Sequence, residues 1–277
     1  MDLILKRVKA DVIFHTAAYK HVPMMEENPV SAIENNFFGT DNLIFAAKKH
    51  KLKRFVHITT DKAVEPVSVY GVSKFLCDWL VMEAAKDADA SSFMVVRFGN
   101  VLGSRGSIMP LFQKQIEKGG PVTITHPEMQ RWFMTIPEAC SLVLKAGGVG
   151  ENGELYLLDM GEPVKIRDLA EQMIRFYGLE VEHDITIEYV GLRQGERLNE
   201  KLVWDNETPQ VTGFDRILNV RRNEPETLDI NAIKEKLKPV CCFDSKQPDI
   251  YRNNEVLKSI LRQYIPSYAA ACYPEGN

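Results

Sequence analysis

Short apolar runs alternate with longer amphipathic segments along the first half of the chain. Strands that are buried on both faces read as near-continuous apolar runs, whereas helices repeat their apolar positions every three to four residues. On this basis we predict strands at residues 12–14, 55–58 and 93–98, with helices at 28–51 and 70–82 between them. Strands that alternate with helices are typical of a doubly wound parallel sheet, so the predicted class is α/β.

The pattern changes near residue 150. Before this point we also predict helices at residues 109–118 and 137–147 and a short strand at 122–125. After it we predict two strands around one helix and then a polar stretch with two further helices, at residues 155–158, 166–177, 185–190, 230–236 and 256–264. We therefore expect an incomplete Rossmann-like catalytic domain at residues 1–150. A smaller α/β substrate-binding lobe with a C-terminal tail is expected at residues 151–277.

Chemically reactive side chains follow the second predicted strand. Thr59-Thr60-Asp61-Lys62 ends the strand, and Tyr70 and Lys74 lie on the next helix. Residues i and i+4 share a helical face, so we expect Lys74 beside Tyr70. Lowering a phenol pKa from about 10 to near 7 takes ~4 kcal/mol, which one ammonium at ~4 Å supplies at an effective dielectric near 20. Such a pair also occurs on solvated helices, but its place after a strand end favours Tyr70 as a general base.

Two other strand ends carry residues that suit ligands. Ala17 and Ala18 follow the first strand and would let a flat ligand approach the backbone, although ordinary tight packing explains them equally well. The third strand ends in GNVLGSRGS at residues 99–107, whose glycines, amide, guanidinium and hydroxyls suit a phosphate-like anion; the alternative is a plain turn. Asn36 lies inside the first long helix, where an asparagine is by default a surface residue.

Composition and charge narrow the range of partners. The chain has 277 residues, of which 45% are hydrophobic and 26% charged, with a net charge of −4 and a pI near 5.9. These values are ordinary for a globular protein and argue against a nucleic-acid or anionic-membrane surface. No apolar run is long enough to span a bilayer, and no signal peptide opens the chain. Five scattered cysteines indicate reduced thiols, so we expect a cytoplasmic protein without a metal site.

Thr-Asp-Lys followed by YxxxK resembles the extended short-chain dehydrogenases/reductases. Five further stretches are similar to the CapD-like nucleoside-diphosphate-sugar 4,6-dehydratases of bacterial polysaccharide biosynthesis: HTAAYKHVPMMEENP, RFGNVLGSRGSIMPLF, THPEMQRWFMTIPEA, LLDMGEPVKIRDLA and GLRQGERLNEKL. They spread from about residue 11 to residue 205, and their combination is specific although no single one is.

The resemblance implies 4,6-dehydration of a UDP-linked N-acetylhexosamine, with NAD or NADP as a recycled cofactor. Tyr70, tuned by Lys74, would take the proton of the sugar 4-hydroxyl while hydride leaves carbon 4. Lys62 would then remove the C5 proton, Asp61 would protonate the departing 6-hydroxyl, and hydride would return to carbon 6. Thr60 would hydrogen-bond near the 4-oxygen. Adjacent opposite charges favour the ionised forms of Asp61 and Lys62, so a dry site or a shared proton must reverse this preference.

The same resemblance implies the binding residues. Cofactor contacts are implied for Ala17, Ala18, Asn36, Tyr70 and Lys74. Substrate contacts with the diphosphate, the sugar and the UDP end are implied for Asn100, Lys20, Arg131, Arg193 and Glu196. A homo-oligomer is implied as well, with a dimer through the Tyr70 and Asn36 helices.

The chain departs from the family pattern before Val12. A strand and a GxGxxG turn should bind the cofactor there, and residues 1–11 contain neither. We therefore expect an exposed apolar edge at the first strand, weak or no NAD(P) binding and little activity from this chain. Tyr70 is kept as in the short soluble members, whereas the C-terminal stretches resemble the large members, which are anchored at the membrane.

Two alternatives to a dehydratase stay open. A sugar-nucleotide epimerase has the same fold, but it needs no acid–base pair such as Asp61–Lys62 for elimination. A non-catalytic remnant that binds a nucleotide sugar or a partner protein would bind UDP without turnover, even with NAD and a complementing N-terminal fragment. Intact Tyr70 and Lys74 favour an enzyme.

Overall fold

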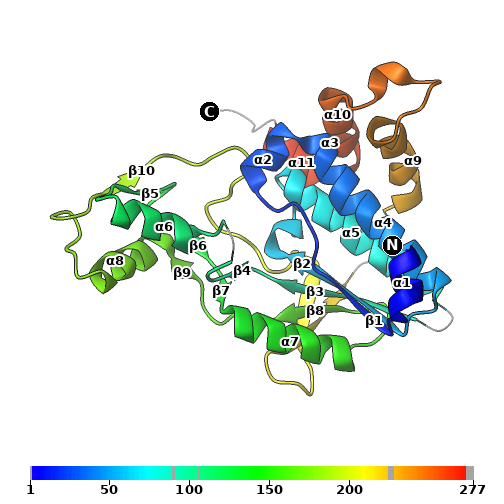
Figure 1. Ribbon diagram of the computed structural model, residues 1–277, viewed down its shortest axis with the longest axis horizontal. Coiled ribbons are helices and arrows are strands. Elements are labelled where there is room, and N and C mark those ends of the chain that lie inside the picture. Colours follow the sequence, from blue (N-terminus) through cyan, green and yellow to red (C-terminus); the bar gives the residue numbers. More distant parts are fainter. Residues whose placement is uncertain (1, 89–90, 105, 224–227, 273–277) are drawn as a thin grey trace.

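A six-stranded sheet forms the centre of the protein in the computed structural model, which describes residues 2–88, 91–104, 106–223 and 228–272 (Figure 1). The strand order is β1-β2-β3-β8-β12-β11. The first four strands run parallel, and β12 and β11 join antiparallel. The strands are β1 Val12–His15, β2 Arg54–Thr60, β3 Ser92–Phe98, β8 Leu155–Leu158, β12 Ile217–Arg222 and β11 Glu207–Val211. This mainly parallel sheet confirms the predicted α/β class.

Helices cover both faces of the sheet (Figure 1). α4 Gly39–Lys49 and α5 Val69–Lys86 lie on one face, and α7 Ile136–Val149 lies on the other. Successive residues of a strand point to opposite faces. On β2, Phe55 therefore packs in the core below α5, whereas Val56 packs in the core below α7. The apolar runs of β2 and β3 reflect this burial on both faces.

β1 is an edge strand, which corrects its predicted burial. Among the described residues it pairs only with β2, and Val12 and Phe14 keep 37% and 36% of their surface exposed. The preceding helix, α1 Asp2–Val8, also exposes apolar side chains, including Leu3 and Val8. The expected apolar edge is thus present, because β1 has a neighbouring strand on one side only.

The helix predicted at residues 28–51 consists of several sections. α3 Pro29–Ala32 leads into a π-helical segment, Ile33–Phe38, which continues into α4, and a separate short helix, α2 Val22–Glu27, lies before the predicted range. Within the π-helical segment Asn36 is only 1% exposed, so its default placement on the surface is wrong. The extra residue per turn of a π-helix shifts the side chains that follow around the helix axis, and such segments often lie at functional sites.

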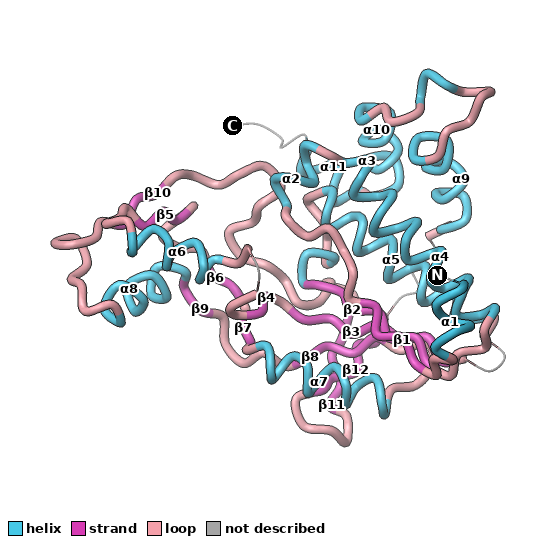
Figure 2. The backbone as a smooth tube through the Cα atoms, in the orientation of Figure 1, coloured by secondary structure: helices cyan, strands magenta, loops and turns pink. Residues whose placement is uncertain are grey.

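A second core lies away from the main sheet (Figure 2). It is built by α6 Ile108–Glu117, β5 Val122–Ile124, α8 Ile166–Phe176 and β10 Ile187–Tyr189. β5 and β10 form a parallel pair. Two further short pairs lie between the two cores in Figure 2, namely β4 Asn100–Val101 with β7 Phe133–Met134 and β6 Gln130–Arg131 with β9 Val164–Lys165. We call the part around the second core the lobe.

The main sheet and the lobe are not consecutive in the sequence, which corrects the division expected at residue 150. α6 and β5 belong to the lobe although they precede residue 150, and β8, β12 and β11 belong to the main sheet although they follow it. The β11–β12 hairpin lies in the stretch taken as polar. Antiparallel strands with one exposed face lack the continuous apolar run by which the other strands were predicted.

Three C-terminal helices pack beside α3 and α5 (Figure 1). They are α9 Ile230–Cys241, α10 Asn254–Tyr264 and α11 Pro266–Cys272, with a 3-10 turn, Pro248–Ile250, after α9. Tyr268 of α11 is 1% exposed. The chain's own C-terminal helices therefore cover one side of the helices through which a dimer was expected.

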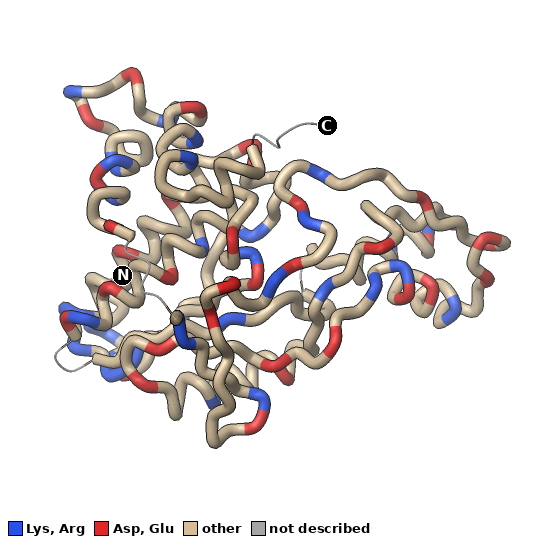
Figure 3. The backbone as a smooth tube through the Cα atoms, turned by 180° about the vertical axis from the view of Figure 1, so that it is seen from behind, with Lys and Arg blue, Asp and Glu red and all other residues tan. Residues whose placement is uncertain are grey.

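Charged positions of both signs are mixed along the chain (Figure 3). The five cysteines are free thiols, and Cys77 and Cys241 are buried. Among the described residues, no helix combines the length and the apolar character needed to cross a membrane.

Candidate active site

A cavity of about 220 Å³ lies at the carboxyl ends of β1, β2 and β3. Parallel strands end at the same edge of a sheet, so the segments that follow them face one site. The lining residues are Thr16, Ala18, Lys20, Ile58, Thr59, Thr60, Lys62, Tyr70, Lys74, Phe98, Gly99, Asn100 and Val101. Most of the predicted catalytic residues are among them. We call this space the catalytic cavity.

Close packing fixes Tyr70 beside the turn that follows β2, the 3-10 turn Asp61–Ala63. The Ser68 hydroxyl caps α5 by accepting a hydrogen bond from the backbone N–H of Gly71 at 3.1 Å. A Cβ added at Gly71 would collide with the carbonyl oxygen of Lys62. Glycine at this position therefore lets the first turn of α5 rest directly on the turn that carries Asp61 and Lys62.

The structure corrects the expected pairing of Lys74 with Tyr70. Lys74 Nζ donates to the carbonyl oxygen of Ile58 at 2.7 Å and lies 3.1 Å from His57 Nε2. Burial lowers the pKa of Lys74. Burial raises the pKa of Tyr70 to about 12, and the charge of Lys62 acts against this rise. Lys62 is thus the lysine that stabilises the phenolate form, because Lys74 is directed at the end of β2.

A buried polar network lies beside Lys74 and was not expected from the sequence. Asp78 Oδ1 lies 3.5 Å from His57 Nε2, and the Thr59 hydroxyl donates to Asp78 Oδ2 at 3.1 Å. Burial raises the pKa of Asp78 to about 6 and lowers that of His57 well below its usual value. Asp78 follows Lys74 by four positions on the predicted helix, so the sequence could have placed its carboxylate on the same helical face as Lys74. No sequence pattern indicated that His57 is close to Lys74, because His57 lies within an apolar strand.

The buried Asp61 and the partly buried Lys62 form an ion pair at the cavity. Lys62 Nζ lies 3.0 Å from Asp61 Oδ1, 3.4 Å from Asn100 Oδ1 and 3.6 Å from Glu200 Oε1. The Thr60 hydroxyl donates to the same Asp61 oxygen at 2.8 Å. Burial lowers the pKa of Lys62, but the carboxylates of Asp61 and Glu200 raise it, and the result is about 12. The expected preference for the ionised forms is therefore built into the site.

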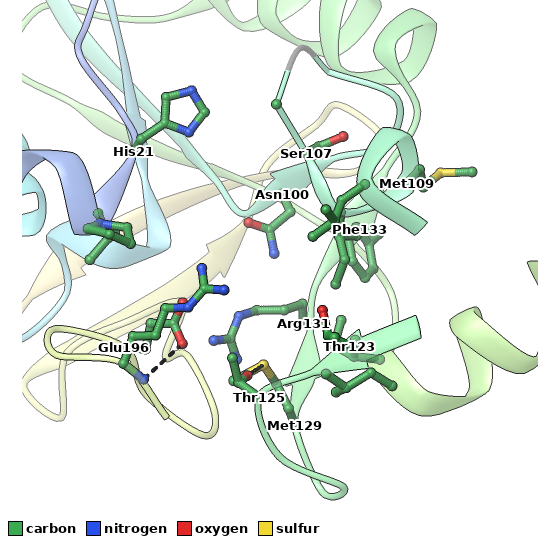
Figure 4. Close-up of a pocket in the computed structure, with 18 of the residues that line it drawn as sticks. His21, Asn100, Ser107, Met109, Thr123, Thr125, Met129, Arg131, Phe133 and Glu196 are labelled. Atoms are coloured by element: carbon green, nitrogen blue, oxygen red, sulfur yellow. Dashed lines mark hydrogen bonds between the residues drawn. The ribbon is translucent and has the colours of Figure 1, made fainter. Parts of the chain in front are cut away.

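A larger cavity of about 330 Å³ lies next to the catalytic cavity and shares Lys20 and Asn100 with it. Arg131, Arg193 and Glu196 also line it, so all the predicted substrate-binding residues meet in this space. Figure 4 shows the side chains of Asn100, Arg131 and Glu196 around its centre. The guanidinium at position 105, expected near a phosphate-like ligand, lies outside the described residues. We call this space the nucleotide cavity.

One loop, residues 191–200, connects the lobe to the 3-10 turn Asp61–Ala63, which carries the predicted catalytic residues Asp61 and Lys62 and which we call the catalytic turn. Arg131 donates hydrogen bonds to two backbone carbonyls of this loop, each at 2.8 Å. Arg197 of the loop donates to the carbonyl oxygen of Val64 at 3.0 Å, just after the catalytic turn. The loop also brings Glu200 to Lys62. Neither Arg197 nor Glu200 was singled out from the sequence, because only the fold shows that this segment reaches the end of β2.

The buried side chain of Asn36 fixes the segment after β1 by hydrogen bonds to the backbone of Tyr19. Its side chain accepts from the backbone N–H of Tyr19 at 2.8 Å and donates to the Tyr19 carbonyl at 3.0 Å and to the Ser73 hydroxyl at 2.9 Å. Ala18 of this segment lines the catalytic cavity, whereas Ala17 is exposed and does not line it. Asn36 therefore shapes the cavity through the backbone that it binds.

The catalytic cavity fits the nicotinamide end of a dinucleotide. Thr16 and Ala18 leave room beside the strand end, and Tyr70 and Lys74 supply polar groups suited to a ribose hydroxyl. Residues 1–11 contain no GxGxxG turn, which is the usual contact for the pyrophosphate of a dinucleotide. No cluster of three or more His, Cys, Asp or Glu side chains in the described part of the chain could hold a metal ion.

The model of the family described as polysaccharide biosynthesis protein matches residues 1–222. The chain belongs to this family. It is 47% identical over 234 residues to the capsular polysaccharide biosynthesis protein CapD of Staphylococcus aureus, which is 84% of this chain and 39% of CapD. It is 38% identical over 195 residues to UDP-glucose 4-epimerase of Rickettsia canadensis, which is 70% of this chain and 56% of that protein. The chain thus spans about two-fifths of the length of CapD.

Solved structures have the same fold. The structure of Pen from Bacillus thuringiensis matches with a TM-score of 0.69 and 35% identity, over 76% of this chain and 66% of Pen. Four further solved structures, each with NAD or NADPH bound, match with TM-scores of 0.58 to 0.64 and 19% to 22% identity. The resemblance to sugar-nucleotide dehydratases and epimerases of the short-chain dehydrogenase/reductase type is confirmed at the level of family and fold.

Proposed function

We propose that this member of the polysaccharide biosynthesis protein family is a sugar-nucleotide 4,6-dehydratase that acts on a UDP-linked N-acetylhexosamine. The observation that carries the proposal is the 3.0 Å contact of Asp61 with Lys62 beside the cavity that contains Tyr70. Elimination of a 6-hydroxyl needs an acid for the leaving oxygen and a base for the C5 proton. Asp61 and Lys62 are one group of each kind, in contact.

Tyr70 takes the proton of the sugar 4-hydroxyl in the first step, after its own phenolic proton has passed to water. A nicotinamide cofactor, NAD or NADP, held beside Ala18, Tyr70 and Lys74, would accept hydride from carbon 4 and return it to carbon 6. The buried phenol is neutral at ordinary pH, because its pKa is about 12. The nearby charge of Lys62 stabilises the phenolate while the Asp61–Lys62 pair is ionised, so Tyr70 acts before the proton moves within that pair.

Asp61 and Lys62 reach their reactive forms by moving one proton within the pair. The ionised pair is a carboxylate and an ammonium, whereas elimination needs a carboxylic acid and an amine. Transfer of the proton along the 3.0 Å hydrogen bond gives this form without any exchange with solvent. Removal of water by the bound substrate favours the neutral pair, because desolvation disfavours charged groups.

The nucleotide cavity would hold the UDP part of the substrate. Arg131, Arg193 and Lys20 line it with positive charge, and Asn100 lies where it meets the catalytic cavity. Charged and amide donors of this kind bind phosphate oxygens. Phe133 adds an apolar surface for the base. This orientation would put the sugar between the two cavities, at Asp61 and Tyr70.

Mass spectrometry of the nucleotide sugar after incubation of the chain with UDP-N-acetylglucosamine and excess NAD tests the proposal. An N-terminal fragment with a glycine-rich turn, taken from a full-length relative, is added in trans in a parallel sample. A product lighter by one water and carrying a 4-keto group supports the proposal, and Asp61→Asn and Lys62→Met should abolish it. UDP binding without any product in either sample would overturn the proposal and indicate a non-catalytic binding protein.

An epimerase is the second candidate, since the chain is similar to the Rickettsia canadensis UDP-glucose 4-epimerase. Epimerisation returns hydride to the carbon that lost it, so the mass of the product equals that of the substrate. Asp61 and Lys62 would have no step to perform in this reaction. A product of unchanged mass, formed equally well by Asp61→Asn, would therefore replace the dehydratase by the epimerase.

A further inference from the structure

A second carboxylate reaches Lys62 from the loop at residues 191–200. Glu200 Oε1 lies 3.6 Å from Lys62 Nζ and 3.9 Å from Arg131 Nη2, and the Glu200 side chain is 6% exposed. A carboxylate so far removed from water is costly unless cations compensate for it. Lys62 and Arg131 are these cations, so the buried charge is held at the catalytic cavity.

The protonation states of Asp61 and Lys62 during the proposed elimination show at which step the Glu200 carboxylate is needed. Lys62 takes the C5 proton while Asp61 still carries the proton that it will give to the 6-hydroxyl. At that moment Asp61 is neutral and Lys62 is an ammonium. Asp61 and Glu200 are the carboxylates within ion-pair distance of Lys62 among the described residues. Only Glu200 is then a charged counterion.

We infer that Glu200 is a positioning residue that serves as the counterion of the Lys62 ammonium during removal of the C5 proton. This role rests on the proposed function. The C5–H bond breaks, its proton goes to Lys62, and its electron pair forms the enolate of the 4-keto sugar. The enolate expels the 6-hydroxyl as water while Asp61 supplies the proton. A nicotinamide cofactor reduced in the first step would supply the hydride that carbon 6 gains, and Lys62 returns its proton to carbon 5.

The charges around Lys62 agree with this role. Asp61 and Glu200 raise its pKa, whereas burial and the positive charge of Arg131 lower it. Tyr70 also faces Lys62, and it stays neutral at ordinary pH. Replacement of Glu200 by glutamine keeps the shape of the side chain and removes its charge, which leaves Arg131 without this partner. The Lys62 amine should therefore lose its proton at a lower pH.

The first test measures the titration of Lys62 in this chain, without cofactor or substrate. The rate at which acetic anhydride labels Lys62 is followed against pH by mass spectrometry of the peptide. We expect Glu200→Gln to lower the midpoint by about 0.7 pH unit or more, since two unit charges near 4 Å already interact by that much in a water-like dielectric. Glu200→Asp should lower it less. The control is Asp205→Asn, because the Asp205 side chain is 87% exposed and pairs with Lys201 instead.

Two results would overturn the inference. One is a Lys62 midpoint in Glu200→Gln that equals those of the wild type and of Asp205→Asn. The other is an equal fall in Glu200→Gln and Glu200→Asp, because then the charge of the carboxylate is not what acts on Lys62.

The second test uses the preparation that turns over UDP-N-acetylglucosamine. Glu200→Gln should lower kcat at least tenfold with little change in KM, and should slow incorporation of solvent deuterium at carbon 5 in the same proportion. An unchanged kcat would overturn the role in the reaction. Failure of the wild type to make a 4-keto product would instead overturn the proposed function, and the Lys62 titration would still report on the contact with Glu200.

Discussion

Glu207→Gln should strongly destabilise the protein, because it removes the counterion of a buried arginine. Arg97 on β3 is 1% exposed, and its guanidinium donates to the two Glu207 oxygens at 2.6 Å and 3.3 Å. Arg222 of β12 lies 3.2 Å from the same carboxylate. The pair therefore joins the edge hairpin to the strand that leads into the catalytic cavity.

The expected cost follows from this burial. Removing one partner of a buried ion pair leaves an uncompensated charge and costs about 3–5 kcal/mol. At about 2–4 °C per kcal/mol for a chain of this size, the melting temperature should fall by roughly 6–20 °C. Burial raises the pKa of Glu207, but Arg97 and its hydrogen bonds lower it further, so the net value lies below that of a free glutamate. The carboxylate thus stabilises the fold at neutral pH, and this contribution is lost as the pH falls through its folded pKa.

Urea unfolding followed by circular dichroism measures the effect at pH 7 and again near pH 4. The difference between wild type and Glu207→Gln should be largest at pH 7 and should shrink at the lower pH. The double variant Arg97→Met/Glu207→Leu should recover much of the loss, because apolar residues can replace a buried ion pair without leaving a charge. A loss below about 1 kcal/mol at pH 7, the range of exposed pairs, would refute the reasoning.

Two further predictions concern the catalytic cavity. Asn36→Leu should destabilise the protein by roughly 1–3 kcal/mol, because the backbone N–H and carbonyl of Tyr19 and the buried hydroxyl of Ser73 lose their partner. In urea unfolding the neighbouring exposed Asn35→Ala should cost far less, and equal losses would contradict this. Tyr70 should ionise near pH 12 in an ultraviolet absorbance titration that Tyr70→Phe simplifies by one group. Since this pKa lies above the unfolded value of about 10, Tyr70 stabilises the fold below pH 10 and loses this effect as the pH rises to 12; a midpoint near 10 would show that the phenol is not buried.

The elements that could be predicted were those marked by a repeat of apolar positions over a short stretch of the chain. The apolar runs at β2 and β3 identified strands with two buried faces, and the alternation with helices gave the α/β class. The hairpin of β11 and β12 was not predicted, since β11 buries only Glu207 and β12 buries only Ile217 and Val220, so neither strand forms an apolar run. The apolar run of β1 by itself indicated a buried strand, and its exposed edge was expected only because the family pattern places a strand before it that residues 1–11 do not contain.

The sequence by itself determined the local chemistry of the site. Asp61 and Lys62 are neighbours in the chain, and Tyr70 and Lys74 are one helical turn apart, so their presence together needs no tertiary information. Their partners were decided by the tertiary structure. Lys74 donates to the end of β2 rather than acting on Tyr70, because packing of α5 on the sheet directs its ammonium there.

Glu200 and Lys62 are separated by more than a hundred residues, and only the fold brings them together. Between them the chain enters the lobe twice, before and after β8 of the main sheet. The tertiary structure also decides the sign and size of each pKa shift. Burial and charge at a site are sums over all elements that pack around it, and a local pattern contains only the neighbours along the chain.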